Sequence, residues 1–101
     1  MGEPQCQIEV LNGTGKPGLA METAVVLRRM GIDVLIVGDA EHYGYKQSLL
    51  IDRKGNPGLL KKLSHLTGCR RILTQIQERP LIDATLIIGD DIEELGICGG
   101  N

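Results

Sequence analysis

The sequence predicts one α/β domain in which a mixed sheet is covered on one face by two helices. Three observations support this class: the chain has 101 residues, it contains two Tyr but no Phe or Trp, and one strand-turn-helix pattern occurs twice. A chain of this length can enclose one hydrophobic core. Because that core must be built from aliphatic residues, it suits a sheet packed against helices.

The first half of the chain predicts a strand at residues 7–11 and a helix that begins at Pro17. Pro is favoured in the first turn of a helix, apolar residues then recur at helical spacing as far as Met30, and Gly31 is typical of the position just past a helix. Residues 34–37 are an uninterrupted apolar run, which is the pattern of a strand buried on both faces.

The second half repeats this order and adds a final strand. Residues 48–52 predict a strand, and the helix that follows carries four leucines on one face and ends at Gly68. Residues 71–77 alternate in hydropathy as a strand does, with Ile72, Thr74 and Ile76 on one side, and residues 84–88 predict a last buried strand. The predicted order is therefore βαββαββ.

The repeated pattern is visible in the sequence itself. Residues 15–20 read GKPGLA and residues 55–60 read GNPGLL, and each copy lies between a predicted strand and a predicted helix. Because βαβ crossovers are right-handed, we expect both helices on the same face of the sheet. The other face is left to a partner, to the loops or to water.

Composition and charge exclude some classes of partner. The 11 Lys and Arg against 13 Asp and Glu give a formal net charge of -2, which provides no general attraction to nucleic acid or to an anionic membrane. We interpret the basic stretch at residues 46–71 and the acidic run at residues 90–94 as solvated surfaces. The sequence has no apolar run of membrane-spanning length and no signal segment, which fits a cytosolic protein or a domain of a longer one. We prefer the longer protein.

Gly13, Gly15 and Gly18 form a GxGxxG pattern between a strand and a helix, the setting of a dinucleotide-binding turn. Two features weaken this reading: Pro17 lacks a backbone N–H, and Asp39 lies 26 residues after the first glycine instead of about 20. We therefore interpret the glycines mainly as a way to set backbone geometry. A nucleotide-binding fragment stays as an alternative, as does weak anion capture at the helix N-terminus.

No catalytic set is recognisable, and we predict that the protein is not an enzyme and has no cofactor. His42 and His65 lack a Ser, Cys or carboxylate at a spacing that implies activation. Cys6, Cys69 and Cys98 lack the spacing of a metal site, although one pair could form a disulfide. The acidic run near the C-terminus does not have the spacing of a Ca²⁺ loop, so we predict no metal site.

The two tyrosines, Tyr43 and Tyr45, share one polar segment between predicted strands. If this segment is exposed, it is the best contact point of the chain, because Tyr offers apolar area and a hydrogen bond at small entropic cost. The alternative is that one ring folds back over the sheet. The candidate ligand-binding residues are Tyr43, Tyr45, Asn12, Gly13, Thr14 and Gly15.

Four segments resemble the LytR C-terminal domain family. They read IEVLNGTG at residues 8–15, PGLA at residues 17–20, GIDV at residues 31–34 and LIIGDD at residues 86–91. Ser48 stands where the family often has Thr. The likeness extends over nearly the whole chain, and it places a single domain at residues 8–94. Residues 1–7 are then expected to be disordered or added for expression, and residues 95–101 to be a flexible tail.

The resemblance implies an accessory domain of an exported or membrane-anchored envelope protein, at the periplasmic or extracellular face of the membrane. The family often follows a LytR-CpsA-Psr domain, whose transferase residues have no counterpart here. It also implies a ferredoxin-like topology similar to that of SPOR domains, which bind peptidoglycan. Membrane contact would come only through other parts of the longer protein.

We therefore expect a non-catalytic binding module that contacts peptidoglycan or another wall polymer, or else a protein partner or a neighbouring domain. We expect no nucleic-acid partner. The alternatives are a purely structural, self-associating domain and the nucleotide-binding fragment described above.

Overall fold

The computed structural model describes residues 6–95, which form five strands, two α-helices and one short 3₁₀ helix. The strands are β1 (Gln7–Asn12), β2 (Asp33–Asp39), β3 (Leu49–Asp52), β4 (Ile72–Thr74) and β5 (Ala84–Ile88). The helices are α1 (Leu19–Arg29), α2 (Pro57–Thr67) and the 3₁₀ helix η1 (Asp90–Glu94). The predicted order βαββαββ is confirmed, with η1 added after the last strand.

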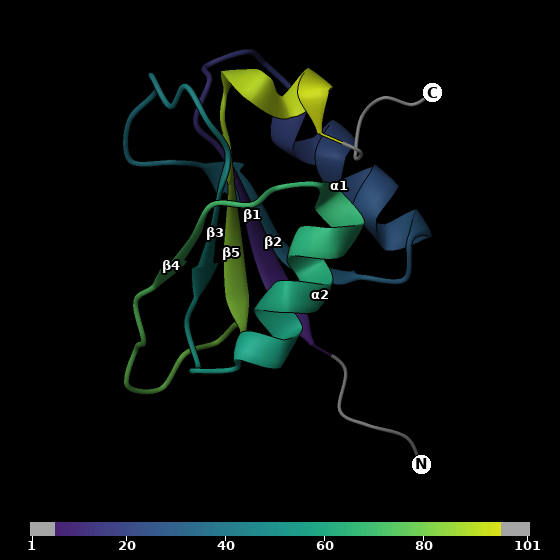
Figure 1. Cartoon of the computed structure of the whole chain (residues 1–101). Helices are drawn as coiled ribbons and strands as arrows, with labels where there is room; N and C mark the ends of the chain where they lie inside the picture. The colour runs from purple at the N-terminus through teal and green to yellow at the C-terminus, as the bar shows by residue number, and fades with distance from the viewer. Residues whose placement is uncertain (1–5, 96–101) are drawn as a thin grey trace.

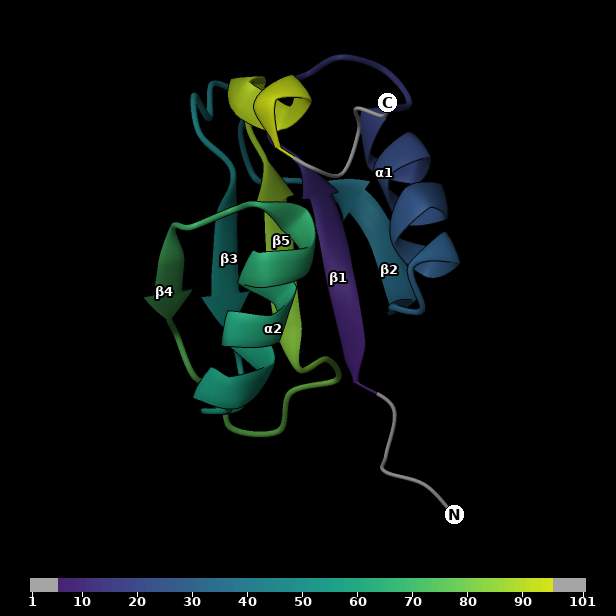
Figure 2. The same ribbon diagram turned by 45° about the vertical axis from the view of Figure 1, so that its right-hand side comes forward.

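The five strands form one mixed sheet in the order β2-β1-β5-β3-β4. β1 runs parallel to β2 and β5, whereas β3 runs parallel to β4 and antiparallel to β5. Each α-helix connects two adjacent parallel strands, and both helices lie on the same face of the sheet (Figure 1 and Figure 2). The predicted two-layer α/β sandwich with both helices on one face is confirmed.

The strand order corrects the expected ferredoxin-like topology. In that topology another strand splits each βαβ unit, whereas here β1 pairs directly with β2 and β3 pairs directly with β4. β5 lies between the two units. All five residues of β5 are buried, so this strand is suited to a central position with neighbours on both sides.

The apolar run of β2 does not make it a central strand, which corrects a second expectation. β2 is at an edge of the sheet, and Leu35 is 47% exposed. A bulge opposite Ile8 and Glu9 shifts its pairing with β1. An apolar run of this kind predicts a strand with two apolar faces. Whether neighbouring elements cover those faces depends on the position of the strand in the sheet.

β4 is the other edge strand, and it is shorter than the predicted strand at residues 71–77. The extended segment nevertheless continues past it, because the backbone N–H groups of Gln75 and Gln77 donate to the carbonyls of Asp52 and Arg53 at 3.0 and 2.9 Å. α1 also begins later than expected, at Leu19, because Gly18 adopts a left-handed conformation with φ of 79°. α2 ends at Gly68 as predicted, again in a left-handed conformation.

The hydrophobic core lies between the sheet and the two helices, and aliphatic side chains fill it. Its largest fully buried members include Ile8, Leu27, Leu50, Leu60 and Leu86. Cys6 and Leu95 pack against this core, so the folded unit extends slightly beyond the predicted boundaries of 8 and 94. The remaining predicted terminal segments, residues 1–5 and 96–101, lie outside the described residues.

No helix within residues 6–95 has both the length and the apolar character needed to cross a membrane.

Candidate functional site: an aromatic ledge on a glycine turn

Asn12 is the last residue of β1 and organises the turn that follows. Its Oδ1 accepts hydrogen bonds from the backbone N–H and the hydroxyl of Thr14 at 2.9 and 2.7 Å, and its Nδ2 donates to the carbonyl of Lys16 at 2.7 Å. Asn12 is buried, with 3% of its surface exposed. Its side chain therefore holds the turn together, as Asx turns do.

The segment that carries the tyrosines lies directly on this turn. The backbone N–H groups of Gly44 and Tyr45 both donate to the carbonyl of Gly13, at 2.9 and 3.1 Å. A Cβ atom on Gly13 would stand 2.6 Å from Cδ1 of Tyr45, and one on Gly15 would stand 3.2 Å from Cδ2 of Tyr43. The structure thus brings together the two groups of candidate residues. Packing of Tyr45 leaves no room for a Cβ at Gly13, whereas Gly15 also needs a left-handed φ of 82°.

The two rings and His42 form a surface that we call the aromatic ledge: His42, Tyr43 and Tyr45. Tyr43 is 54% exposed, whereas Tyr45 is half-buried and stacks on His42 with ring centroids 4.7 Å apart and an angle of 7° between the planes. The sequence had suggested that His42 was isolated, because stacking across a loop leaves no spacing signature. Rings with polar edges can stack on an apolar face of a ligand and hydrogen-bond to its hydroxyls.

Contacts with η1 and the end of β5 fix the far end of the tyrosine segment. The backbone N–H of Asp90 donates to the carbonyl of Tyr45 at 2.9 Å. Oδ1 of Asp91 accepts from the backbone N–H and hydroxyl of Ser48 at 2.8 and 2.7 Å, and the Ser48 hydroxyl accepts from the N–H of Gly89 at 2.9 Å. The sequence reading had placed Asp91 in a solvated acidic run. Instead, its side chain is partly buried and holds Ser48, in a segment that carries part of the family resemblance.

The packing of the tyrosine segment on the turn argues against a dinucleotide-binding site there. Asp39 pairs with Asn12 at the carboxyl ends of β2 and β1, so an acidic residue does stand beside the turn. In a dinucleotide site the second glycine lets the pyrophosphate approach the backbone. Here that glycine, Gly15, faces the ring of Tyr43 instead.

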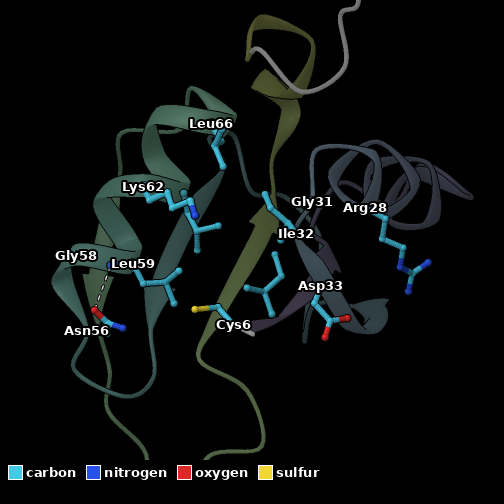
Figure 3. A pocket seen from close by; sticks show the side chains of 12 residues that line it. Cys6, Arg28, Gly31, Ile32, Asp33, Asn56, Gly58, Leu59, Lys62 and Leu66 are labelled. Carbon is cyan, nitrogen blue, oxygen red and sulfur yellow. Dashed lines mark hydrogen bonds between the residues drawn. The ribbon is translucent and has the colours of Figure 1, made fainter. Parts of the chain in front are cut away.

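A second concave region lies between α1 and α2, with a volume of about 660 Å³ (Figure 3). Its walls include the aliphatic side chains of Ile8 in β1, Ile32 just before β2 and Leu63 in α2. Two cationic residues, Arg28 of α1 and Lys62 of α2, lie on opposite sides of it. The groove is therefore lined by both aliphatic and polar side chains, with cations on two sides of it.

Most polar groups of the groove are already bonded within the protein. Nη2 of Arg28 donates to the carbonyl of Val34 at 2.8 Å, and Oδ2 of Asp33 accepts from the side chain of Gln7 at 3.2 Å. Oδ1 of Asn56 caps α2 by accepting from the backbone N–H of Leu59 at 3.1 Å. Three of the four polar or charged side chains that line the groove, Arg28, Asp33 and Asn56, are therefore positioned by hydrogen bonds within the protein.

The titratable and nucleophilic side chains within residues 6–95 do not gather into a catalytic or metal-binding set. No group of three or more His, Cys, Asp or Glu side chains in this part of the chain is placed to hold a metal ion. His65 is exposed on α2, and Cys6 and Cys69 are both free thiols. Burial raises the pKa of the Cys69 thiol, which disfavours the reactive thiolate.

A family model described as the LytR cell envelope-related transcriptional attenuator matches residues 5–91. Among solved structures, the soluble domain of a conserved hypothetical secreted protein from Mycobacterium marinum is similar, with 18% sequence identity and a TM-score of 0.73. The match covers 90% of this chain and 63% of that one, and it shows the fold. No curated protein matches the chain.

Proposed function

The chain belongs to the LytR C-terminal domain family, and on that premise we propose that it is a non-catalytic accessory module of an extracytoplasmic envelope protein. Its ligand is a glycan of the cell wall, which it binds at the aromatic ledge. One observation carries the proposal: both tyrosines, the only Phe, Tyr or Trp residues of the chain, lie in one surface segment.

The use of aromatic residues in this protein supports a binding role for the ledge. The core needs no aromatic ring, because aliphatic side chains fill it. Neither tyrosine belongs to that core, and Tyr43 is 54% exposed. Tyr is enriched at interfaces because its ring is apolar and its hydroxyl is polar, and the apolar face of a sugar ring is a suitable partner for it.

The rigidity of the ledge is the second support. Its backbone is held to Gly13 on one side and to Asp90 on the other by hydrogen bonds of 2.9–3.1 Å. A loop that is already ordered loses little conformational entropy when a ligand binds. A glycan that binds this segment therefore gains from its preorganisation.

The family supports the proposed location. Its description refers to the cell envelope, and wall polymers lie outside the cytoplasmic membrane, so we place this domain there as part of a longer exported or anchored protein. A protein partner at the same ledge is the alternative outcome of the experiment below.

The test is a titration of the isotope-labelled protein with soluble peptidoglycan fragments and with an anionic wall polymer, followed by amide chemical shifts. We expect shifts confined to residues 12–16 and 41–47. Tyr43→Ala removes the exposed ring and should weaken binding at least about tenfold, while the thermal unfolding midpoint stays within a few degrees of wild type.

Met21→Ala is the matched control, because Met21 on α1 is 52% exposed, nearly the same fraction as Tyr43. This variant should bind like wild type. Absence of shifts with every wall component, or equal losses in the two variants, would contradict the glycan proposal. Shifts at the ledge with a protein partner alone would replace the glycan by that partner.

A further inference from the structure

β4 and the residues on either side of it form a continuous exposed segment. Every residue from Arg70 to Arg79 is exposed. Three of these residues are large and apolar, namely Ile72 at 46%, Leu73 at 46% and Ile76 at 61% exposure. An exposed apolar strand at the edge of a sheet is a template for pairing with another strand.

The backbone of this segment has one free side. Toward β3, the carbonyl of Arg71 accepts from Leu50, and the N–H groups of Gln75 and Gln77 donate to Asp52 and Arg53. The backbone N–H and C=O groups of the odd-numbered residues therefore point toward β3. Because successive backbone groups of a strand point to alternate sides, the N–H and C=O groups of residues 72, 74 and 76 point away from β3. β4 is the outermost strand, so these groups face away from the sheet; Figure 2 shows β4 at this edge.

The opposite edge, β2, differs in three respects that discourage pairing. A bulge interrupts its register, and the guanidinium of Arg28 covers the carbonyl of Val34 at 2.8 Å. Its two ends are Asp33 and Asp39. An antiparallel second copy in full register would set Asp33 against Asp39, and like charges directly opposite each other repel. β4 has none of these protections among its described residues.

We propose that β4 pairs antiparallel with β4 of a second copy of this chain, about a twofold axis at Thr74. In this register Thr74 faces Thr74, and Ile72 of each copy faces Ile76 of the other. The same register brings Arg70 of each copy toward Glu78 of the other. The sheets of the two copies then join into one continuous sheet, and the contact is isologous and closes as a symmetric dimer.

The sequence of the outward-facing residues selects this register. The residues on one side of Thr74 are suitable partners for those on the other side when the second strand runs in the opposite direction. Only registers that pair even-numbered residues with even-numbered residues satisfy the free backbone groups. Among these, the twofold at Thr74 pairs the two exposed isoleucines and opposes unlike charges at both ends of the segment. Both kinds of cross-strand pair stabilise antiparallel strands. No residue of the aromatic ledge takes part.

The experiment measures the solution mass of the full chain by analytical ultracentrifugation over a range of concentrations. Wild type should dimerise. Arg70→Glu and Glu78→Arg each place like charges together and should each weaken the dimer at least about tenfold. The double variant R70E/E78R restores unlike charges and should return the dissociation constant to within about threefold of wild type.

Two further variants separate the interface from general charge and folding effects. Arg29→Glu makes the same charge change on α1, at an exposed position away from β4, and should leave the dimer intact. Thr74→Pro removes an outward N–H without touching the bonds to β3, and edge strands tolerate Pro; it should give a folded monomer. A wild-type monomer at all concentrations, a dimer that survives Thr74→Pro, or a double variant as weak as the single ones would overturn the proposal.

Discussion

The molecule has two strand-to-helix corners, residues 12–19 and 52–59. They share one turn geometry but differ in what packs on it. In the first, Oδ1 of Asn12 accepts from the backbone of Thr14; in the second, Oδ1 of Asp52 accepts from three consecutive backbone N–H groups at 2.8–3.1 Å. Gly15 and Gly55, forty residues apart, have φ of 82° and 81°. This shared part is the scaffold of both corners.

The corners diverge on either side of that scaffold. The second enters its helix at Pro57, where the side chain of Asn56 caps Leu59. The first delays its helix until Leu19, after a left-handed Gly18. Only the first corner carries the tyrosine segment, and only there is the position after the Asx residue a glycine. The difference teaches that the same turn can serve only to join a strand to a helix, as in the second corner, or can also support aromatic rings, as in the first.

The largest effect is expected for Gly13→Ala. The new Cβ would stand 2.7 Å from the carbonyl oxygen of Ile88 and 2.6 Å from Tyr45, so backbone must move, at a cost of about 3 kcal/mol. Arg53→Ala changes the equivalent position of the second corner and should cost about 1 kcal/mol, because Arg53 is only half-buried there. Urea denaturation at constant m-value measures both. Equal losses of unfolding free energy in the two variants would mean that packing of Tyr45 on Gly13 does not constrain the first corner.

Asp52→Ala is expected to come next, at about 2 kcal/mol, because three backbone N–H groups lose their acceptor together. Asp52→Asn keeps an oxygen at the same place, as Asn12 has in the first corner, and should cost less than half as much. The midpoint of urea unfolding is the readout. If the Asn variant is as unstable as the Ala variant, the two corners do not share the turn chemistry described above.

Gly15→Ala and Gly55→Ala should have equal and smaller effects, each about 1–2 kcal/mol, since both glycines are left-handed. Each new Cβ would also stand 3.2 Å from one movable side chain, Tyr43 or Ile76. Thermal unfolding of the two variants side by side tests the equivalence of the corners. A difference larger than about 1 kcal/mol would show that one glycine has a further role.

The smallest effect should differ in sign between the corners. Gly58 lies in the first turn of α2 without a positive φ, and its nearest neighbour would stand 3.6 Å from a new Cβ. Gly58→Ala should therefore stabilise the protein by about 0.5–1 kcal/mol. Gly18→Ala should destabilise it by about 1 kcal/mol, because Gly18 is left-handed. Changes of the same sign would contradict the different helix entries of the two corners.

Sequence reasoning located the elements well where local chemistry decides them. Gly68 ended α2 as predicted, and the strand at residues 84–88 is buried on both faces. It failed where exposure depends on neighbours. The run at residues 34–37 has the same apolar character as β5, yet β2 is an edge strand with Leu35 half exposed.

The candidate site shows the same division. Both halves of it, the glycine turn and the tyrosine segment, were found from residue type alone. The stacking of His42 on Tyr45 and the clamp of Asp91 on Ser48 were not found. These contacts join residues through the fold and leave no periodic or motif signal.

By itself the sequence determined the element order, the two corners and the aliphatic composition of the core, because propensity, turn chemistry and hydropathy periodicity act over a few residues. The tertiary structure alone decided which strands became edges, and it alone laid the tyrosine rings on Gly13 and Gly15. Those outcomes depend on packing between segments far apart in the sequence, such as β1 and β5 or the glycine turn and the tyrosine segment. No local pattern encodes that packing.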